Sequence, residues 1–169
     1  YKLYQLSTGD LLRSEIKNKS DLGNKISSII NSGELVSDEI VGNLIEKFVS
    51  KEEFKNKIIF DGYPRTLTQA KKLDTLLEKT NQKINIVLKL SVSLETIKER
   101  IAERQTQEKR SDDSEEIAIK RFKTYQKSSE PILDYYKKYN LLSVINGEAS
   151  ITEISSEISG LIEGIKGWH

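Results

Sequence analysis

The feature that most constrains the fold is an alternation of short apolar runs with longer stretches of helical periodicity. The apolar runs at 57–61, 84–90 and 141–145 are predicted to be buried strands. Apolar residues recur at helical spacing, mostly behind good helix-start residues, at 7–16, 20–33, 37–48, 66–81, 93–101, 115–131 and 151–165. Because strands that alternate with helices favour a parallel sheet, we predict a three-layer α/β/α fold with a parallel sheet.

Two stretches interrupt this pattern. Pro131 lies inside a helical stretch, and we expect the helix to bend or restart there. The polar stretch 105–114 contains no hydrophobic residue and is predicted to be exposed. No internal repeat and no linker divides the chain, so residues 1–169 are predicted to form a single domain.

The composition excludes several classes of function. The chain has no cysteine and a single histidine, His169, so we expect no disulfide and no thiolate or imidazole metal cluster. No apolar run approaches the roughly 20 residues that cross a bilayer, and we expect no membrane partner. The net charge of +1 gives no overall attraction for nucleic acid. We therefore expect a soluble, cytoplasmic protein whose ligands are small molecules.

Arginine is rare among the basic residues and therefore informative. The chain has 27 basic residues, of which only these are arginine: Arg13, Arg65, Arg100, Arg104, Arg110 and Arg121. The planar guanidinium group binds phosphate oxygens with two parallel hydrogen bonds, which lysine cannot do. The alternative for any one of them is an ordinary surface cation.

Two of these arginines lie in segments typical of phosphate sites. In the segment 7–13, a helix start offers free backbone N–H groups to an anion, and Arg13 follows one turn later; an ordinary capped helix with a surface arginine is the alternative. The segment 61–65 places a carboxylate, Asp61, at the end of a predicted strand, then a glycine and a proline-stiffened Arg65. A simple surface turn is the alternative here.

The other arginines cluster later in the chain. Arg100 and Arg104 are four residues apart and share one helix face, where like charges repel unless an anion offsets them. Arg110 precedes the pair 112–113 of aspartates, and Arg121 lies in the next helix. A solvated charged face would explain the cluster, and so would guanidinium groups that close over a polyphosphate.

Together these motifs resemble the adenylate kinases. The shared segments follow in order and spacing from Tyr1 to about Ile165: 7–13 (Ser-Thr-Gly-Asp-Leu-Leu-Arg), 33–36 (Gly-Glu-Leu-Val), 61–65 (Asp-Gly-Tyr-Pro-Arg), Gln69, Arg100 and Arg104, 110–113 (Arg-Ser-Asp-Asp) and Arg121. The resemblance implies reversible, Mg²⁺-dependent phosphoryl transfer between ATP and AMP that gives two ADP, with a sheet of the phosphate-loop kinase type. It also implies an AMP-binding helical part at 8–50 and a short lid at 104–114.

The resemblance assigns roles to individual residues. Those expected to bind AMP are Thr8, Gly9, Arg13, Glu34, Leu35, Val36, Gly62, Arg65 and Gln69. Those expected at ATP are Arg100, Arg104, Gly147 and Ala149, and the water shell of Mg²⁺ is expected at Asp61. The phosphates and the transferring group are expected to contact Arg65, Arg100, Arg104, Arg110 and Arg121, with Asp112 and Asp113 positioning the lid arginines.

One part of the family pattern is not found in the sequence. The family has a first central strand and a glycine-rich phosphate-binding loop ahead of the segment that begins at Tyr1, and no Gly-x-x-x-x-Gly-Lys-Ser/Thr motif occurs here. We expect a polypeptide that begins at Tyr1 to bind ATP poorly and to catalyse little. We expect the full-length family to be monomeric, and strand exchange or a dimer for a fragment without that strand.

Two other functions are compatible with these motifs. A UMP/CMP kinase is the first, but those relatives usually have a small residue at Thr8 and differ around Gln69; a hydroxyl and an amide suit the edge of adenine, which favours AMP. A non-catalytic, nucleotide-binding fragment is the second.

Overall fold

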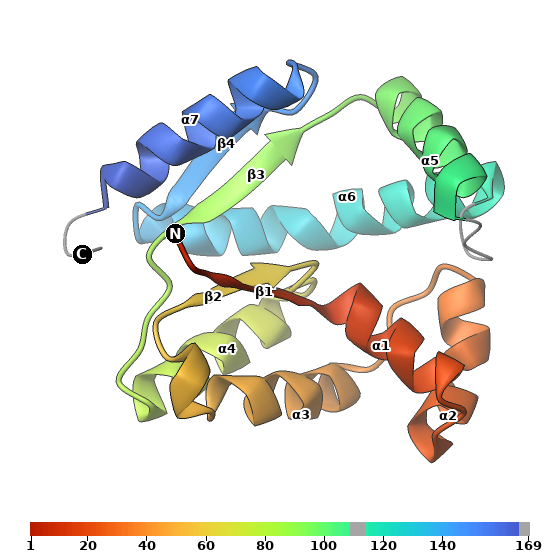
Figure 1. The fold of residues 1–169 in the computed structure, drawn as a ribbon, viewed down its shortest axis with the longest axis horizontal. Coiled ribbons are helices and arrows are strands. Elements are labelled where there is room, and N and C mark those ends of the chain that lie inside the picture. Colours follow the sequence, from red (N-terminus) through yellow and green to blue (C-terminus); the bar gives the residue numbers. More distant parts are fainter. Residues whose placement is uncertain (109–113, 166–169) are drawn as a thin grey trace.

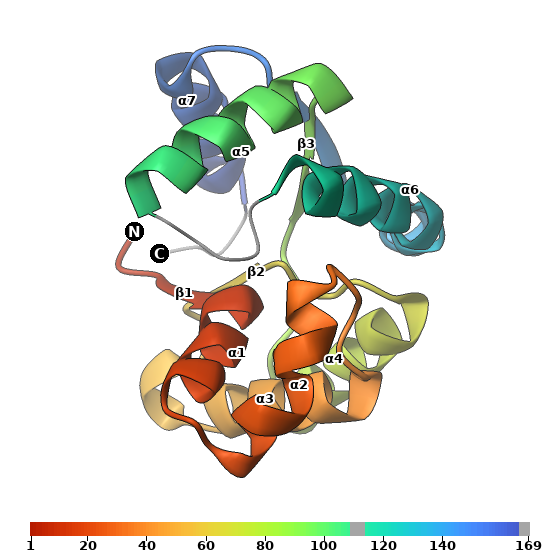
Figure 2. The same cartoon turned by 90° about the vertical axis from the view of Figure 1, so that its right-hand side faces the viewer.

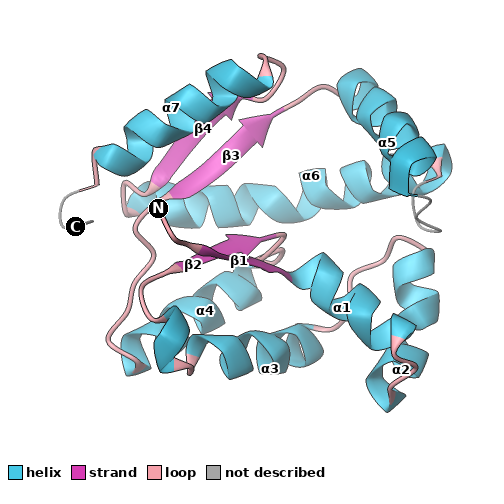
Figure 3. Ribbon diagram, in the orientation of Figure 1, coloured by secondary structure: helices cyan, strands magenta, loops and turns pink. Residues whose placement is uncertain are grey.

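The computed structural model describes residues 1–108 and 114–165, in which strands and helices alternate as predicted. β1 (Tyr4–Ser7) pairs with β2 (Ile58–Asp61), and β3 (Val87–Ser91) pairs with β4 (Leu142–Asn146). Both pairs are parallel, which confirms the α/β class and the strand direction. The described strands form two separate two-stranded sheets rather than one (Figure 3), and β1 was not predicted as a strand.

Most helices begin where the sequence predicted. The helices are α1 (Thr8–Lys17), α2 (Asp21–Asn31), α3 (Asp38–Val49), the short 3₁₀ helix η1 (Glu52–Phe54), α4 (Leu67–Lys79), α5 (Leu94–Glu108), α6 (Glu115–Lys138) and α7 (Ile151–Glu163). Helices α1, α2, α3, α4, α6 and α7 each follow a serine or threonine whose side chain accepts a hydrogen bond from a backbone N–H of the first turn.

Two details of the helices differ from the prediction. Helix α6 continues through Pro131 without a restart, and Ile132 and Tyr136 just beyond it are buried with Ala70 of α4. Helix α5 extends to Glu108 and so includes part of the polar stretch 105–114. The rest of that stretch, except Ser114, lies outside the described residues.

The main core surrounds β1 and β2. Leu6 of β1 is 1% exposed and belongs to a cluster with Ile26 of α2, Ile45 of α3 and Leu73 of α4. Their burial removes apolar surface from water, worth about 1.5–3 kcal/mol for each large side chain. This cluster holds β1 and β2 in place. The segments that begin at Thr8 and Gly62 follow directly from the carboxyl ends of these strands.

The prediction that the strands are fully buried is wrong. Ile59 of β2 is 46% exposed, Leu90 of β3 is 45% exposed and Val144 of β4 is 58% exposed. A sheet of two strands has few neighbours, so each strand keeps some side chains in contact with water.

Helix α6 connects the two halves of the molecule. It packs on α4 and α5 and also contacts β4, while α7 covers β4 from the other side. In Figure 1, α6 crosses the molecule between the β3–β4 sheet and α4. Figure 2 shows α1 and α2 as a pair at the end of β1, facing the start of α6.

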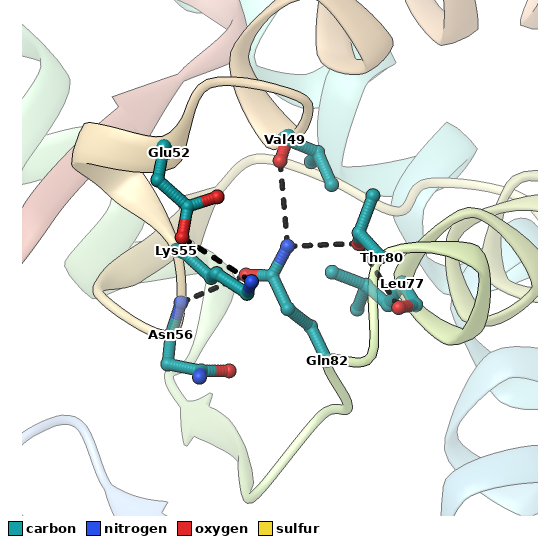
Figure 4. Close-up of polar contacts among 7 residues, drawn as sticks. All are labelled: Val49, Glu52, Lys55, Asn56, Leu77, Thr80 and Gln82. Atoms are coloured by element: carbon teal, nitrogen blue, oxygen red, sulfur yellow. Dashed lines mark hydrogen bonds and ion pairs between the residues drawn. The ribbon is translucent and has the colours of Figure 1, made fainter.

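A buried amide holds the approach to β2. Gln82, which is 8% exposed, donates from Nε2 to the Val49 carbonyl (3.3 Å) and to Thr80 Oγ1 (2.8 Å). Its Oε1 accepts from the Asn56 N–H at 2.8 Å (Figure 4). Gln82 thereby ties the ends of α3 and α4 to the turn that leads into β2.

The described part of the chain, residues 1–108 and 114–165, contains no helix of the length and apolar character that a membrane crossing requires.

Candidate functional site

A cavity opens at the carboxyl ends of β1 and β2, beneath the first half of α6. All nine residues that were expected to bind AMP line it, together with Arg121. Four residues without a predicted role complete the lining: Leu12, Ile30, Gly33 and Val41. Ligands of open α/β sheets bind beyond the carboxyl ends of the strands, so the cavity has the position that such a fold uses for a ligand.

Three guanidinium groups lie close together at this cavity. The pKa of Arg65 is lowered, first by desolvation among the surrounding atoms, then by the charge of Arg121 and more weakly by that of Arg13. Asp61 acts in the opposite direction. Arg65 nevertheless retains access to solvent. A concentration of positive charge at an accessible cavity suits an anion, because an anion would relieve the mutual repulsion.

The loop after β2 orients Arg65. Arg65 Nε donates to the Gly62 carbonyl at 2.8 Å, and Gly62 has a φ of +69°, a conformation that favours glycine. A Cβ atom built on Gly62 would lie 2.9 Å from Arg65 Nη2 and 3.3 Å from Thr8 Oγ1. The absence of a side chain at Gly62 therefore leaves room for both groups.

Thr8 begins α1 and is 4% exposed. Its hydroxyl donates to the Gly62 carbonyl at 3.0 Å, with the Asp61 carbonyl at 3.4 Å as a weaker acceptor. Since a hydroxyl has a single hydrogen, Thr8 can offer a ligand only its lone pairs. It suits a ligand that donates a hydrogen bond, such as an exocyclic amino group.

Arg13 lies one turn into α1. Its Nη2 donates to Asp10 Oδ1 at 2.5 Å, and the guanidinium lies over Gly9, where a Cβ atom would approach Arg13 Nη2 to 3.0 Å. Gly9 therefore allows the guanidinium to lie against the helix start.

Gln69 lies in the first turn of α4 and is 2% exposed. Its Oε1 accepts from the Arg65 N–H at 2.7 Å, and its Nε2 donates to Asp38 Oδ1 at 2.8 Å. The side chain is thereby fixed against both the Arg65 loop and the start of α3.

The segment 33–36 connects α2 to α3 and forms another wall of the cavity. Glu34 makes an ion pair with Lys120 at 3.1 Å, and Arg121 Nη2 contacts the Ile30 carbonyl at 3.5 Å. Val36 is buried, and Leu35 is partly buried. These contacts join α6 to the α2–α3 connection and bring Arg121 to the cavity.

The residues expected at ATP lie elsewhere, at the carboxyl ends of β3 and β4. Arg100 Nη2 donates to the Gly147 carbonyl at 2.8 Å, which joins α5 to the loop after β4. Ala149 lies in the same loop and Arg104 one turn further along α5. Arg110, Asp112 and Asp113 lie outside the described residues.

Glu148, which had no predicted role, lies beside the residues expected at ATP. Glu148 Oε1 accepts from the Ser93 N–H at 2.9 Å and from Thr96 Oγ1 at 3.2 Å, so it caps the start of α5 from a distant loop. The hydrogen bonds from Ser93, followed by that from Thr96, hold the pKa of Glu148 below its ordinary value.

Asp61, the residue expected to hold the water shell of Mg²⁺, offers a single carboxylate. It is exposed at the end of β2, and its Oδ2 accepts from Gln5 Nε2 at 2.8 Å. Within residues 1–108 and 114–165, no three His, Cys, Asp or Glu side chains gather as a metal cage. Mg²⁺ usually keeps several waters and binds one or two carboxylates plus substrate phosphates. A single exposed carboxylate fits a water-mediated contact of that kind.

Asp38 was missed by the sequence analysis, although it holds Gln69. It lies in the first turn of the helix predicted at 37–48, where an acidic residue is ordinary. Its partner lies 31 residues away. The pairing therefore left no local signal.

The comparisons with known proteins agree with the geometry. The family model described as "Adenylate kinase" matches residues 1–141. The chain is 36% identical to an adenylate kinase of Pelagibacter ubique strain HTCC1062, over 96% of this chain and 89% of that protein. It is 39% identical to one from Caulobacter sp. strain K31, over 95% and 85%. It is 42% identical to one from Prochlorococcus marinus strain SARG, over 90% and 81%. The chain belongs to the adenylate kinase family.

Proposed function

We propose that the chain takes part in reversible phosphoryl transfer between ATP and AMP, which gives two ADP. The observation that carries this proposal is the convergence of Arg13, Arg65 and Arg121 at one cavity. Phosphoryl transfer needs positioned positive charge around the phosphoryl oxygens more than covalent help from the protein. A nucleoside monophosphate supplies the anion that this cavity favours.

The neutral groups of the cavity support adenine as the base. The Thr8 hydroxyl can accept a hydrogen bond from an amino group, and the Gln69 amide can both accept and donate. Leu35 and Val36 supply apolar surface for a flat ring. We assign AMP to this cavity, with Gly9, Glu34 and Gly62 contributing backbone or wall contacts.

We assign ATP to the loops after β3 and β4. Arg100 is already anchored to Gly147, and Arg104 follows on the same helix. Gly147 and Ala149 would border the adenine of ATP. Residues 104–114, with Arg110, Asp112 and Asp113, would form the lid that excludes water as a competing acceptor.

The residues of the chain bind and orient the substrates. Arg65 is held by the Gly62 carbonyl, so its guanidinium is preorganised for the phosphate of AMP. Arg121 faces the same cavity from α6 and would bridge it to the transferring group. Mg²⁺, when bound with ATP, neutralises phosphate charge, and Asp61 would hold its water shell.

The proposal is tested by calorimetric titration of the chain with AMP, with CMP as the competing nucleotide. We expect AMP to bind at least tenfold more tightly than CMP. Arg65→Ala should weaken AMP binding by one to two orders of magnitude, since hydrogen bonds to charged groups contribute about 1.5–3 kcal/mol.

Lys25→Ala is the matched control for the loss of one positive charge, because Lys25 is exposed on α2 away from the cavity. It should leave the affinity within about twofold, as expected for an exposed charge. Equal binding of AMP and CMP, or an unchanged affinity in Arg65→Ala, would contradict the proposal. Formation of ADP from ATP and AMP is the accompanying activity assay.

A further inference from the structure

Asp38 joins two helices at the edge of the cavity without lining it. It is the first residue of α3 and is partly buried. Its Oδ2 accepts from Thr66 Oγ1 at 3.0 Å, and its Oδ1 accepts from Gln69 Nε2 at 2.8 Å. Both partners are neutral, so the carboxylate acts here as a fixed pair of acceptors.

The chemistry of its neighbours determines which way the Gln69 amide points. An ionised carboxylate only accepts, so the NH₂ group of Gln69 must face Asp38. The backbone N–H of Arg65 only donates, so the carbonyl oxygen of Gln69 must face Arg65. A flipped amide would set two acceptors against each other on one side and two donors on the other. The order of donor and acceptor at this wall of the cavity is therefore fixed.

The fixed amide still has hydrogen-bonding capacity for a ligand. An amide NH₂ has two hydrogens and its oxygen two lone pairs. Asp38 and Arg65 use one of each, which leaves one donor and one acceptor position on a side chain that lines the cavity.

We propose that Asp38 is a specificity-determining residue, which acts through Gln69 to select a 6-aminopurine over a 6-oxopurine nucleotide. This inference rests on the proposed binding of AMP at the cavity. A 6-aminopurine presents a donor beside an acceptor, and a 6-oxopurine presents the same two functions in the opposite order. If both bases bind in the same pose, Gln69 can pair with the 6-oxopurine only after its amide flips, and the flip breaks its bonds to Asp38 and Arg65.

A purely structural role for Asp38 predicts a different outcome. If Asp38 only joined α3 to α4, its loss would weaken every nucleotide that enters the cavity to the same extent. If Asp38 sets the amide direction together with the Arg65 N–H, its loss removes one of these two constraints, which weakens AMP binding while a 6-oxo nucleotide gains affinity or keeps it. The ratio of the two affinities therefore separates the roles.

The experiment compares AMP with inosine monophosphate, its 6-oxo counterpart, by calorimetric titration of the whole chain. For Asp38→Ala, we expect AMP binding to weaken about tenfold, equivalent to one charge-assisted hydrogen bond. Inosine monophosphate should bind within about twofold of the unmodified chain or more tightly, so the selectivity falls about tenfold. Asp38→Asn places an amide opposite Gln69 that can donate as well as accept, so it does not fix the amide direction and should also lose selectivity.

Glu39→Ala is the matched control, because Glu39 is the exposed neighbour of Asp38 in the same helix turn. It removes the same charge and should leave the selectivity unchanged. Asp38→Ser serves where the alanine variant does not fold. The serine hydroxyl donates as readily as it accepts and so fixes no amide direction; it should also lose the selectivity.

The outcomes separate the inference from the proposal beneath it. Selectivity within about twofold of the unmodified chain in both Asp38→Ala and Asp38→Ser would overturn the role of Asp38, yet leave AMP binding at the cavity intact. Failure of the unmodified chain to bind AMP would overturn the proposed function and this inference with it. Loss of selectivity in the Asp38 variants but not in Glu39→Ala supports both.

Discussion

Gly62 offers a sharp test of the geometry, because one methyl group at that position meets two site residues. The residue has a φ of +69°, and a left-handed conformation costs an alanine about 1–2 kcal/mol. The added Cβ would also lie 3.3 Å from Thr8 Oγ1. For Gly62→Ala we therefore expect a loss of about 1–2 kcal/mol in the free energy of unfolding, which lowers the melting temperature by roughly 2–8 °C at this chain length.

The same substitution should impair binding more than folding. The added Cβ would lie 2.9 Å from Arg65 Nη2, the far end of a flexible side chain. The guanidinium can move away at little cost to stability, but it then leaves the direction set by its bond to the Gly62 carbonyl. We expect AMP affinity to fall by about tenfold or more, as when one hydrogen bond to a charged group is lost.

Gly42→Ala is the matched control for the Gly62 substitution. Gly42 lies inside α3, and a Cβ atom there would meet no atom within 4 Å. Alanine in a helix is more favourable than glycine by about 1 kcal/mol, so this variant should melt at a higher temperature and bind AMP normally. Thermal unfolding and calorimetry check both variants. A Gly62→Ala chain that melts and binds like the unmodified chain would refute the reasoning.

Three further predictions concern stability. Gln82→Leu leaves the Val49 carbonyl and the Asn56 N–H without the amide that now bonds both. Because Val49 is buried and Asn56 is exposed to water, the loss should be about 1–3 kcal/mol, mainly for the Val49 carbonyl, measured by urea unfolding. Burial, and then the charge of Asp38, raises the pKa of Tyr63 to about 12. The contribution of Tyr63 to the free energy of unfolding should therefore be fully present below pH 10, the ordinary pKa of tyrosine, and should be lost as the pH rises through about 12. Tyr63→Phe should reduce that loss of stability. The lowered pKa of Glu148 acts in the opposite sense. Its contribution to stability is present above the ordinary carboxyl pKa and is lost as the pH falls through the lowered pKa. Glu148→Gln should therefore reduce the loss of stability at acid pH.

The helices could be predicted because their signals are local. Ser20, Ser37 and Ser150 each precede an amphipathic stretch, and each caps the helix that was expected there. The strand β1 was not recognised because it has only four residues, and so short an alternation of apolar and polar side chains is a weak strand signal. The division into two sheets depends on which strands pair, and pairing is decided by contacts between residues far apart in the chain.

In the candidate site, too, some features could be predicted from the sequence and others could not. The motifs around Thr8 and Gly62 are contiguous, so their residues could be named from the sequence, and the cavity brings them together. The contact of Lys120 with Glu34 and that of Asp38 with Gln69 join distant segments, and no periodicity indicates either one. The roles of these residues in binding remain predictions that the titrations test.

The structure also explains why arginine rather than lysine occupies these positions. Arg65 is anchored to the Gly62 carbonyl through Nε, and Arg100 is anchored to the Gly147 carbonyl through one Nη. A guanidinium has five N–H groups in a rigid plane, so a bond through one nitrogen also fixes the direction of the others. A lysine ammonium rotates about its stem and gains no such direction from a single bond. Gly62 and Arg65 both line the cavity, so there the loop that forms the wall also sets the direction of the guanidinium. An arginine-to-lysine change at Arg65 keeps the charge and removes that direction, and we expect it to lower AMP affinity nearly as much as alanine does.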